Sequence, residues 1–185
     1  MNEQAIRPVS VYTRPGFYPG PVILAACATA AGFNQDAKYP AVTDVQGKHW
    51  TPSGLQIILA LAGAESSGNA FAYHQNASDG SMDHGIWQIN DKAHPEWFGP
   101  AADSSKSAYN PWDCAVMAWL VHVGANYAWT PWVAYKTGAY LKWRDPAISE
   151  TWMSWAAHGI AKLNTLTAAG QTLLQIATAD LDEPA

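Results

Sequence analysis

Cysteine and charged residues are both scarce in this chain of 185 residues. Its two cysteines, Cys27 and Cys114, are too few for a disulfide framework, and no CxxC pair is present to bind zinc. Both lie in apolar helical patterns, which favours buried thiols, although a single bridge between them stays open because the compartment is unknown.

Positive charge is especially scarce. Ten Lys and Arg against fifteen Asp and Glu give a formal net charge of -5. No Lys/Arg cluster is available to neutralise phosphates, so nothing indicates a nucleic-acid partner. No polybasic segment indicates an anionic membrane surface, and no run reaches the roughly 20 apolar residues of a transmembrane helix. We therefore expect a soluble protein with no nucleic acid partner and no membrane anchor.

The apolar segment Gly20 to Gly32 could be either an ordinary helix or the apolar region of a secretory signal. A secretory signal would place a short basic region directly before it, whereas Tyr18, Pro19 and Gly20 have the chemistry of a turn. We expect an ordinary helix from about Pro21 to Ala31, with a signal h-region as the alternative.

Apolar residues are plentiful. They make up 49% of the chain and include ten tryptophans, which excludes a disordered segment. The length suits one domain with a buried core. The first twenty residues, rich in proline and glycine, predict an irregular N-terminal arm, and residues 21–185 a single domain.

Local signals predict mostly helix. Each of four pairs combines a capping residue with proline at the first helical position: Thr51-Pro52, Asn110-Pro111, Thr130-Pro131 and Asp145-Pro146. The first of these helices should end at Gly68-Asn69, and an amphipathic stretch from Thr165 to Leu181 should close the chain. Between Tyr73 and Asn90 the helical period disappears and Asp79-Gly80 predicts a small hairpin. The expected class is mainly α (α+β), a helical bundle with one small β-hairpin.

Two carboxylates stand out in unlike settings. Glu65 ends an apolar helical run, where burial would keep it protonated. Asp83 lies in the predicted hairpin among small polar residues, which suits an ionised group. Such a pair can divide the work of breaking a glycosidic bond, one protonating the leaving oxygen and the other supporting positive charge at the sugar carbon. The plainer alternatives are a solvated helix-end glutamate and an aspartate that serves the turn.

Three short elements carry a family resemblance: "AESSGNAFA" from Ala64, "GIWQIN" from Gly85 and "AYKTGAY" from Ala134. In order and spacing they resemble the catalytic elements of the lysozyme-like superfamily, specifically soluble lytic transglycosylases and related actinobacteriophage lysins. The segment "SDGSMDHGIWQIN" also resembles the hairpin of chicken-type lysozymes. The resemblance covers roughly Pro52 to Trp143 and implies a lysozyme-like fold.

The resemblance also implies residue roles. Glu65 would be the general acid, and Asp83 the nucleophile or charge stabiliser. Gln88 and Tyr135 would hold the sugar, supported by Ser66 and Asn90. Lys136 departs from the transglycosylase pattern, which has Asn there. The implied activity is cleavage of the β-1,4 bond between N-acetylmuramic acid and N-acetylglucosamine in peptidoglycan, with no cofactor.

The resemblance leaves the reaction and the context open. Lytic transglycosylases generally use only the glutamate, so Asp83 favours hydrolysis without deciding it. A phage origin would make the protein an endolysin, held in the host cytoplasm before release, or a virion-associated lysin that contacts phage tail proteins. The alternative from another class is a non-catalytic glycan-binding or structural virion component with a lysozyme fold.

The tryptophans are candidates for sugar binding, and one group of His, Asp and Glu residues is a candidate for metal binding. Flat indole faces suit sugar rings, and Trp87 and Trp97 are the better candidates for the cleft. Helical patterns predict core positions for five others: Trp112, Trp119, Trp132, Trp152 and Trp155. A further group, His84, Asp91, His94 and Glu96, lies close in sequence but matches no metal-ligand spacing, so we expect no metal site.

Overall fold

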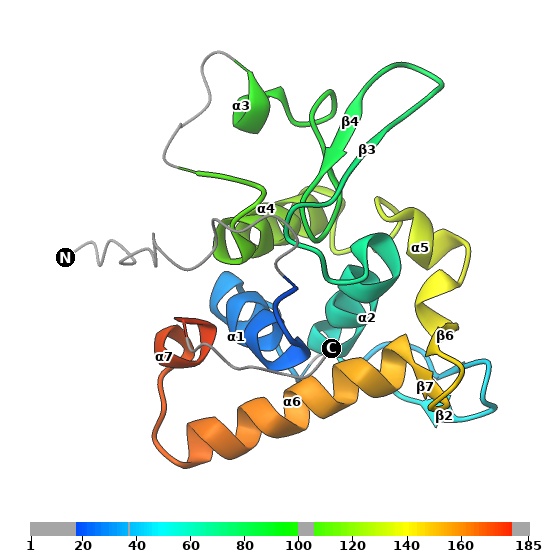
Figure 1. The fold of residues 1–185 in the computed structure, drawn as a ribbon, viewed down its shortest axis with the longest axis vertical. Coiled ribbons are helices and arrows are strands. Elements are labelled where there is room, and N and C mark those ends of the chain that lie inside the picture. Colours follow the sequence, from blue (N-terminus) through cyan, green and yellow to red (C-terminus); the bar gives the residue numbers. More distant parts are fainter. Residues whose placement is uncertain (1–17, 37, 100–105, 179–185) are drawn as a thin grey trace.

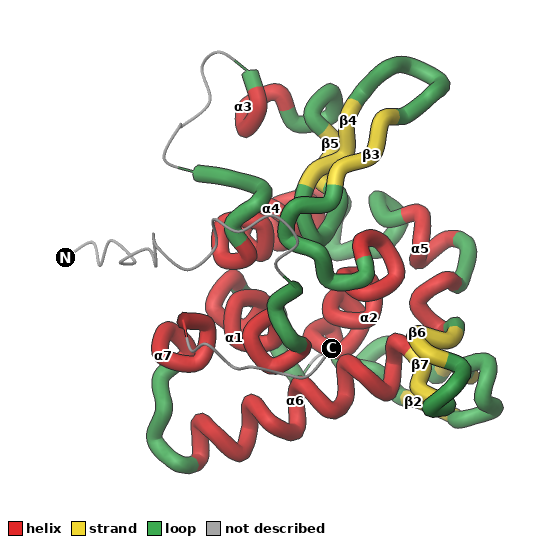
Figure 2. The backbone as a smooth tube through the Cα atoms, in the orientation of Figure 1, coloured by secondary structure: helices red, strands yellow, loops and turns green. Residues whose placement is uncertain are grey.

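The computed structural model describes residues 18–36, 38–99 and 106–178. The helices are α1 (Pro21–Ala31), α2 (Gly54–Ser66), α3 (Pro95–Phe98), α4 (Pro111–Gly124), α5 (Val133–Lys136), the 3-10 helix η1 (Ala139–Leu141), α6 (Trp152–Ala168) and α7 (Leu173–Thr178). The strands are β1 (Val42–Thr43), β2 (His49–Trp50), β3 (Tyr73–Gln75), β4 (Met82–His84), β5 (Ile89–Asn90), β6 (Trp143–Asp145) and β7 (Glu150–Thr151). The predicted class, mainly α with little antiparallel β, is confirmed (Figures 1 and 2).

Helix α2 lies inside the molecule. Every residue from Leu55 to Gly63 except Gln56 is buried, and the helix contacts α1, α5, α6 and η1. Helix α6 runs along one side beneath α1 and α2, while β3, β4 and α3 extend on the opposite side (Figure 1). Burial of an apolar helix on all sides is what its composition requires, because no face is polar enough for water. The C-terminal end of α2, which carries Glu65, is thereby packed against α5.

Both ends of α2 differ slightly from the prediction. Ser53, rather than Thr51, is the capping residue, because its side chain accepts a hydrogen bond from the amide of Gln56. At the other end Ser67 already adopts the left-handed conformation, one residue before Gly68. The predicted existence and extent of the helix are otherwise confirmed, as they are for α1.

The predicted hairpin is present and has a third strand. Strands β3, β4 and β5 form an antiparallel sheet in which Asp83 pairs with His74 on one side and with Asn90 on the other. The turn lies between Asn76 and Ser81. Paired residues in an antiparallel sheet point to the same face, so the side chains of Asp83 and Asn90 are brought together.

Two predicted helix starts are wrong, although Asn110 caps α4 as expected. Helix α5 begins at Val133 and lasts one turn, because Gly138 has a φ of 69° and leads the chain into η1. Pro146 lies in the turn between β6 and β7. Helix α6 begins six residues later, where the Thr151 side chain accepts a hydrogen bond from the Ser154 amide. The cap-and-proline signal is shared by turns.

Other predictions have mixed outcomes. Cys27 and Cys114 are both buried, free thiols. The predicted final helix is divided into the end of α6 and the short α7. Most of the predicted N-terminal arm and the last residues of the predicted final helix lie outside the described residues. In the part of the chain that the structure describes, no helix is long and apolar enough to cross a membrane.

Candidate active site

Glu65 lies in the last turn of α2, next to the first turn of α5. The backbone N–H of Ala134 donates a 2.8 Å hydrogen bond to its Oε1 atom. That N–H belongs to the first turn of a helix and has no acceptor within α5. Glu65 therefore caps α5 from outside, which joins two elements that are distant in sequence.

The surroundings of Glu65 favour its neutral form. Burial raises the pKa of the Glu65 carboxyl above its ordinary value, and the nearby negative charge of Asp83 adds to this effect. The hydrogen bond from Ala134 and the positive charge of Lys136 act in the opposite direction, but the net shift is upward. A carboxyl group that holds its proton at higher pH is suited to act as a general acid.

Asp83 lies in a polar setting on the central strand β4. The side-chain amide of Asn90 donates to Oδ1 at 2.7 Å, and that of Asn76 donates to Oδ2 at 3.0 Å. Both amides also donate to the hydroxyl oxygen of Ser81, at 2.9 and 3.1 Å, and this hydroxyl donates to Asp79 at 2.7 Å. The network fixes the Asp83 carboxylate, because each of its oxygens accepts from a side chain that is itself held.

The two carboxylates open onto one cleft of about 290 Å³ at the end of α2. Its lining consists of Glu65, Asn76, Asp83, Gln88, Asn90, Pro131, Trp132 and Val133. Four of the residues predicted from sequence therefore meet here: Glu65, Asp83, Gln88 and Asn90. Gln88 enters from a left-handed backbone conformation, with φ of 49°, and its side-chain N–H donates to the Gly85 carbonyl at 2.7 Å.

A second hollow of about 210 Å³ adjoins this cleft and shares Gln88, Asn90, Pro131 and Trp132 with it. It extends the cleft to His94, whose ring stacks on Trp97 with centroids 4.6 Å apart. Trp97 is partly exposed but is not part of either lining. The second hollow therefore extends the cleft towards the stacked rings of His94 and Trp97.

Three other predicted site residues do not line the first cleft. Trp87 belongs to the lining of the second hollow, but its side chain is buried and its indole N–H donates to the Ile58 carbonyl at 2.9 Å. Ser66 donates to the Ala62 carbonyl within its own helix. Tyr135 stacks on Tyr140, with ring centroids 5.3 Å apart, and does not belong to the lining of the cleft.

Sequence reasoning missed Asn76 and the wall formed by Trp132 as parts of the site. Asn76 could have been found from the hairpin register, because side chains two apart on a strand share a face with their cross-strand partners. Trp132 was predicted as a core residue and is buried, yet it also lines the cleft. Its indole N–H donates to the Trp87 carbonyl at 3.1 Å, so Trp87 supports the cleft from behind. Among the described residues, no group of three or more His, Cys, Asp or Glu could hold a metal ion.

Comparison with known proteins gives one match. The family profile described as "Lysozyme like domain" matches residues 45–134, just under half of the chain. The match includes α2 with Glu65 and the three-stranded sheet with Asp83, and it ends at Ala134, whose amide binds Glu65. No curated protein and no solved structure matches the chain.

Proposed function

Because residues 45–134 form a lysozyme-like domain, we propose that this chain is a muramidase that cleaves the β-1,4 bond between N-acetylmuramic acid and N-acetylglucosamine. The family match by itself supports the coarser statement, a glycosidase or transglycosylase that acts on peptidoglycan at the bacterial cell wall. The observation that carries the proposal is the pair of carboxylates in one cleft, Glu65 in a site that raises its pKa and Asp83 in a hydrogen-bonded polar network.

In the proposed reaction Glu65 gives its proton to the glycosidic oxygen as the bond from that oxygen to the sugar carbon breaks. Positive charge then develops at this carbon and its ring oxygen, opposite the Asp83 carboxylate. Asn76 and Asn90 keep that carboxylate in place, so no reorganisation is needed when the charge appears. Glu65, now ionised, accepts a proton from the group that attacks the carbon in the second step.

The attacking group decides the product. If water attacks, the product is a reducing sugar; if the muramyl 6-hydroxyl attacks, the product is a 1,6-anhydro sugar. We propose hydrolysis, because two carboxamides that hold Asp83 at the cleft support a second working carboxylate, which a glutamate acting alone would not need. No cofactor enters either route.

The biological setting is proposed from the resemblance. It fits a phage lysin of a Gram-positive host, either an endolysin released from the cytoplasm or a virion-associated protein that contacts tail proteins. We also propose that residues 21–185 act as one domain, which the packing of α1 against α2, α4, α6 and α7 supports.

Mass spectrometry of the products from purified peptidoglycan tests the proposal, with wild type and Glu65→Gln compared. We expect reducing-end muropeptides from wild type and none from the variant, whose amide cannot give a proton. Products lighter by one water with 1,6-anhydro ends would replace hydrolysis with lytic transglycosylation. Full activity in Glu65→Gln would overturn the assignment of Glu65. Glycan binding without cleavage by wild type would indicate a non-catalytic binding protein.

A further inference from the structure

A separate hollow of about 270 Å³ lies near the other end of α2 from Glu65. It is enclosed by the loop before β1, by β2, by the first turn of α2 and by α6, and none of its lining residues belongs to the catalytic cleft. We propose that this hollow binds one N-acetylated amino sugar of a wall glycan strand, and that it prefers the carboxylate-bearing N-acetylmuramic acid. The proposal takes its ligand class from the proposed function.

One end of the hollow is an indole held in a fixed orientation. The N–H of Trp50 donates a 2.8 Å hydrogen bond to the buried carboxylate of Asp44, and the Lys48 ammonium lies 3.8 Å from the centroid of its ring. Trp50 is partly exposed where it lines the hollow. A flat apolar surface that is already ordered suits the C–H groups of a sugar ring, because binding then costs little side-chain entropy.

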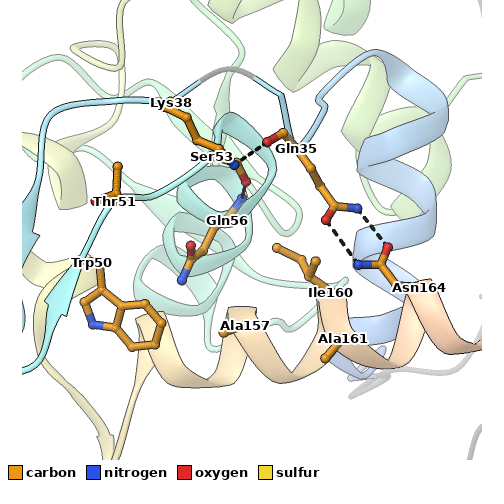
Figure 3. A pocket seen from close by; sticks show the side chains of 10 residues that line it. All are labelled: Gln35, Lys38, Trp50, Thr51, Ser53, Gln56, Ala157, Ile160, Ala161 and Asn164. Atoms are coloured by element: carbon orange, nitrogen blue, oxygen red, sulfur yellow. Dashed lines mark hydrogen bonds between the residues drawn. The ribbon is translucent and has the colours of Figure 1, made fainter.

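The floor of the hollow is apolar and the end opposite Trp50 is rich in amides (Figure 3). Helix α6 supplies Ala157, Ile160 and Ala161 to the floor. At the opposite end Gln35 and Asn164 form a reciprocal pair, with hydrogen bonds of 2.9 and 3.2 Å. An acetamido group has the same two parts, a methyl for the apolar floor and an amide for the carboxamides.

Charge selects among such sugars. Among the described residues of the lining Lys38 is the single cation, and its ammonium donates a 2.6 Å hydrogen bond to the Gln35 carbonyl. None of the described residues that line the hollow carries a carboxylate. An ammonium has three donors, so Lys38 keeps donors for an anionic ligand. The lactyl carboxylate of N-acetylmuramic acid meets this requirement, whereas N-acetylglucosamine has no charge.

The position of the hollow connects it to catalysis. Gln56, in its lining, and Glu65 lie nine residues apart on one helix, about 14 Å at 1.5 Å per residue. Because α2 is rigid and buried, the two sites keep a constant separation. A second contact with the polymer raises the effective concentration of glycan at the first. That matters for an acidic chain whose sequence has no Lys/Arg cluster to hold it on the wall.

The test is a binding titration of the Glu65→Gln variant, which prevents cleavage, followed by NMR of backbone amides and of the Trp50 indole N–H. The probes are two monosaccharides, N-acetylmuramic acid and the neutral N-acetylglucosamine. We expect both to shift the signals of Trp50, Gln56 and Asn164, with tighter binding of N-acetylmuramic acid. Lys38→Gln should weaken that preference and its dependence on salt, because screening acts on the charge pair, while the Lys48 ammonium beside Trp50 keeps its charge.

A blocking variant separates the hollow from the cleft. Ala161 is an exposed residue of α6 in the floor, and Ala161→Trp fills the hollow, whereas Ala168→Trp places the same side chain on the same helix outside it. In the Glu65→Gln background, Ala161→Trp should abolish the shifts at Trp50 and lower the affinity for sedimented peptidoglycan about tenfold. Ala168→Trp should change neither.

Each outcome addresses one proposal. Shifts at Asn76 and Gln88 without any at Trp50 and Asn164 would overturn the second site and leave the proposed function intact. Shifts at Trp50 from a wild-type protein that never cleaves peptidoglycan would overturn the proposed function and keep the site. Equal affinities of the two probes would overturn the assignment to Lys38.

Discussion

Replacing Gly85 by alanine should destabilise the protein strongly, and the structure offers a matched comparison. Gly85 follows β4 with a φ of +71°, and Gly80 in the hairpin turn has nearly the same value, +72°. A Cβ atom on Gly85 would lie 1.9 Å from the Ala108 carbonyl oxygen and 3.1 Å from Cys114 Sγ, whereas one on Gly80 would meet nothing within 4 Å. Both substitutions therefore place alanine in a left-handed backbone conformation, but only Gly85→Ala also creates a steric clash.

The magnitude follows from these two contributions. A non-glycine residue in the left-handed region costs about 1–2 kcal/mol, which applies to Gly80→Ala and Gly85→Ala alike. The clash at Gly85 is with backbone, which cannot rotate away, and overpacking of this kind costs about 1–3 kcal/mol more. The shared reduction in unfolded-state entropy cancels in the comparison. The difference in unfolding free energy between the variants should therefore be about 1–3 kcal/mol.

Urea unfolding followed by far-ultraviolet circular dichroism measures this difference. With a slope of about 1–3 kcal/mol per molar urea, the midpoint of Gly85→Ala should lie about 1 M below that of Gly80→Ala. Peptidoglycan cleavage should fall only in Gly85→Ala, because Gly85 accepts the hydrogen bond from the Gln88 side chain and precedes β5. Equal midpoints for the two variants would refute the steric argument and leave only the conformational cost.

Three further predictions concern titratable side chains. Lys136→Gln should move the alkaline limb of the pH–rate profile to higher pH, because Lys136 lowers the pKa of Glu65 and the acid must be protonated to act. Asp44→Ala should cost about 3 kcal/mol in urea unfolding, because this buried carboxylate accepts hydrogen bonds from Trp50 and three other donors. His122→Gln should flatten the decline of thermal stability below about pH 6.5, because burial lowers the pKa of His122 and the folded state resists its protonation.

Matched variants distinguish these effects from general damage. Lys142→Gln removes an exposed lysine that does not act on Glu65, and a limb that moves equally in both variants would contradict the first prediction. Asp36→Ala removes an exposed acid and should leave the unfolding midpoint unchanged. His158→Gln alters an exposed histidine, and a pH dependence that disappears there rather than in His122→Gln would contradict the third.

Asp44 and His122 change the stability of the folded state over different ranges of pH. Burial alone would raise the pKa of Asp44, but the hydrogen bonds it accepts from Trp50, Thr151, Lys48 and Gln46 together lower it. Its contribution to stability is therefore complete above about pH 4, the ordinary value of an aspartate, and is lost as the pH falls further. Thermal unfolding of wild type and Asp44→Ala should accordingly converge in strong acid.

Sequence by itself determined those features that depend on neighbours along the chain. The apolar run before Glu65 implied a buried helix, the Asp79-Gly80 turn implied a hairpin, and Asn110 with Pro111 implied a helix start, all of which the structure contains. Each depends on capping, turn chemistry or periodicity within a few residues. The resemblance to lysozyme-like proteins likewise rested on short elements, and the family match supports it.

Only the tertiary structure decided which side chains reach the cleft. Trp87 was predicted as a surface for sugar binding, and the structure buries its side chain while leaving the residue in the lining of the second hollow. The signal at Asp145-Pro146 became a turn between strands. The hydrogen bond from Ala134 to Glu65 joins residues 69 positions apart. Local pattern sets the tendency to form a helix or turn, but burial and hydrogen-bond partners depend on what the rest of the chain packs against each position.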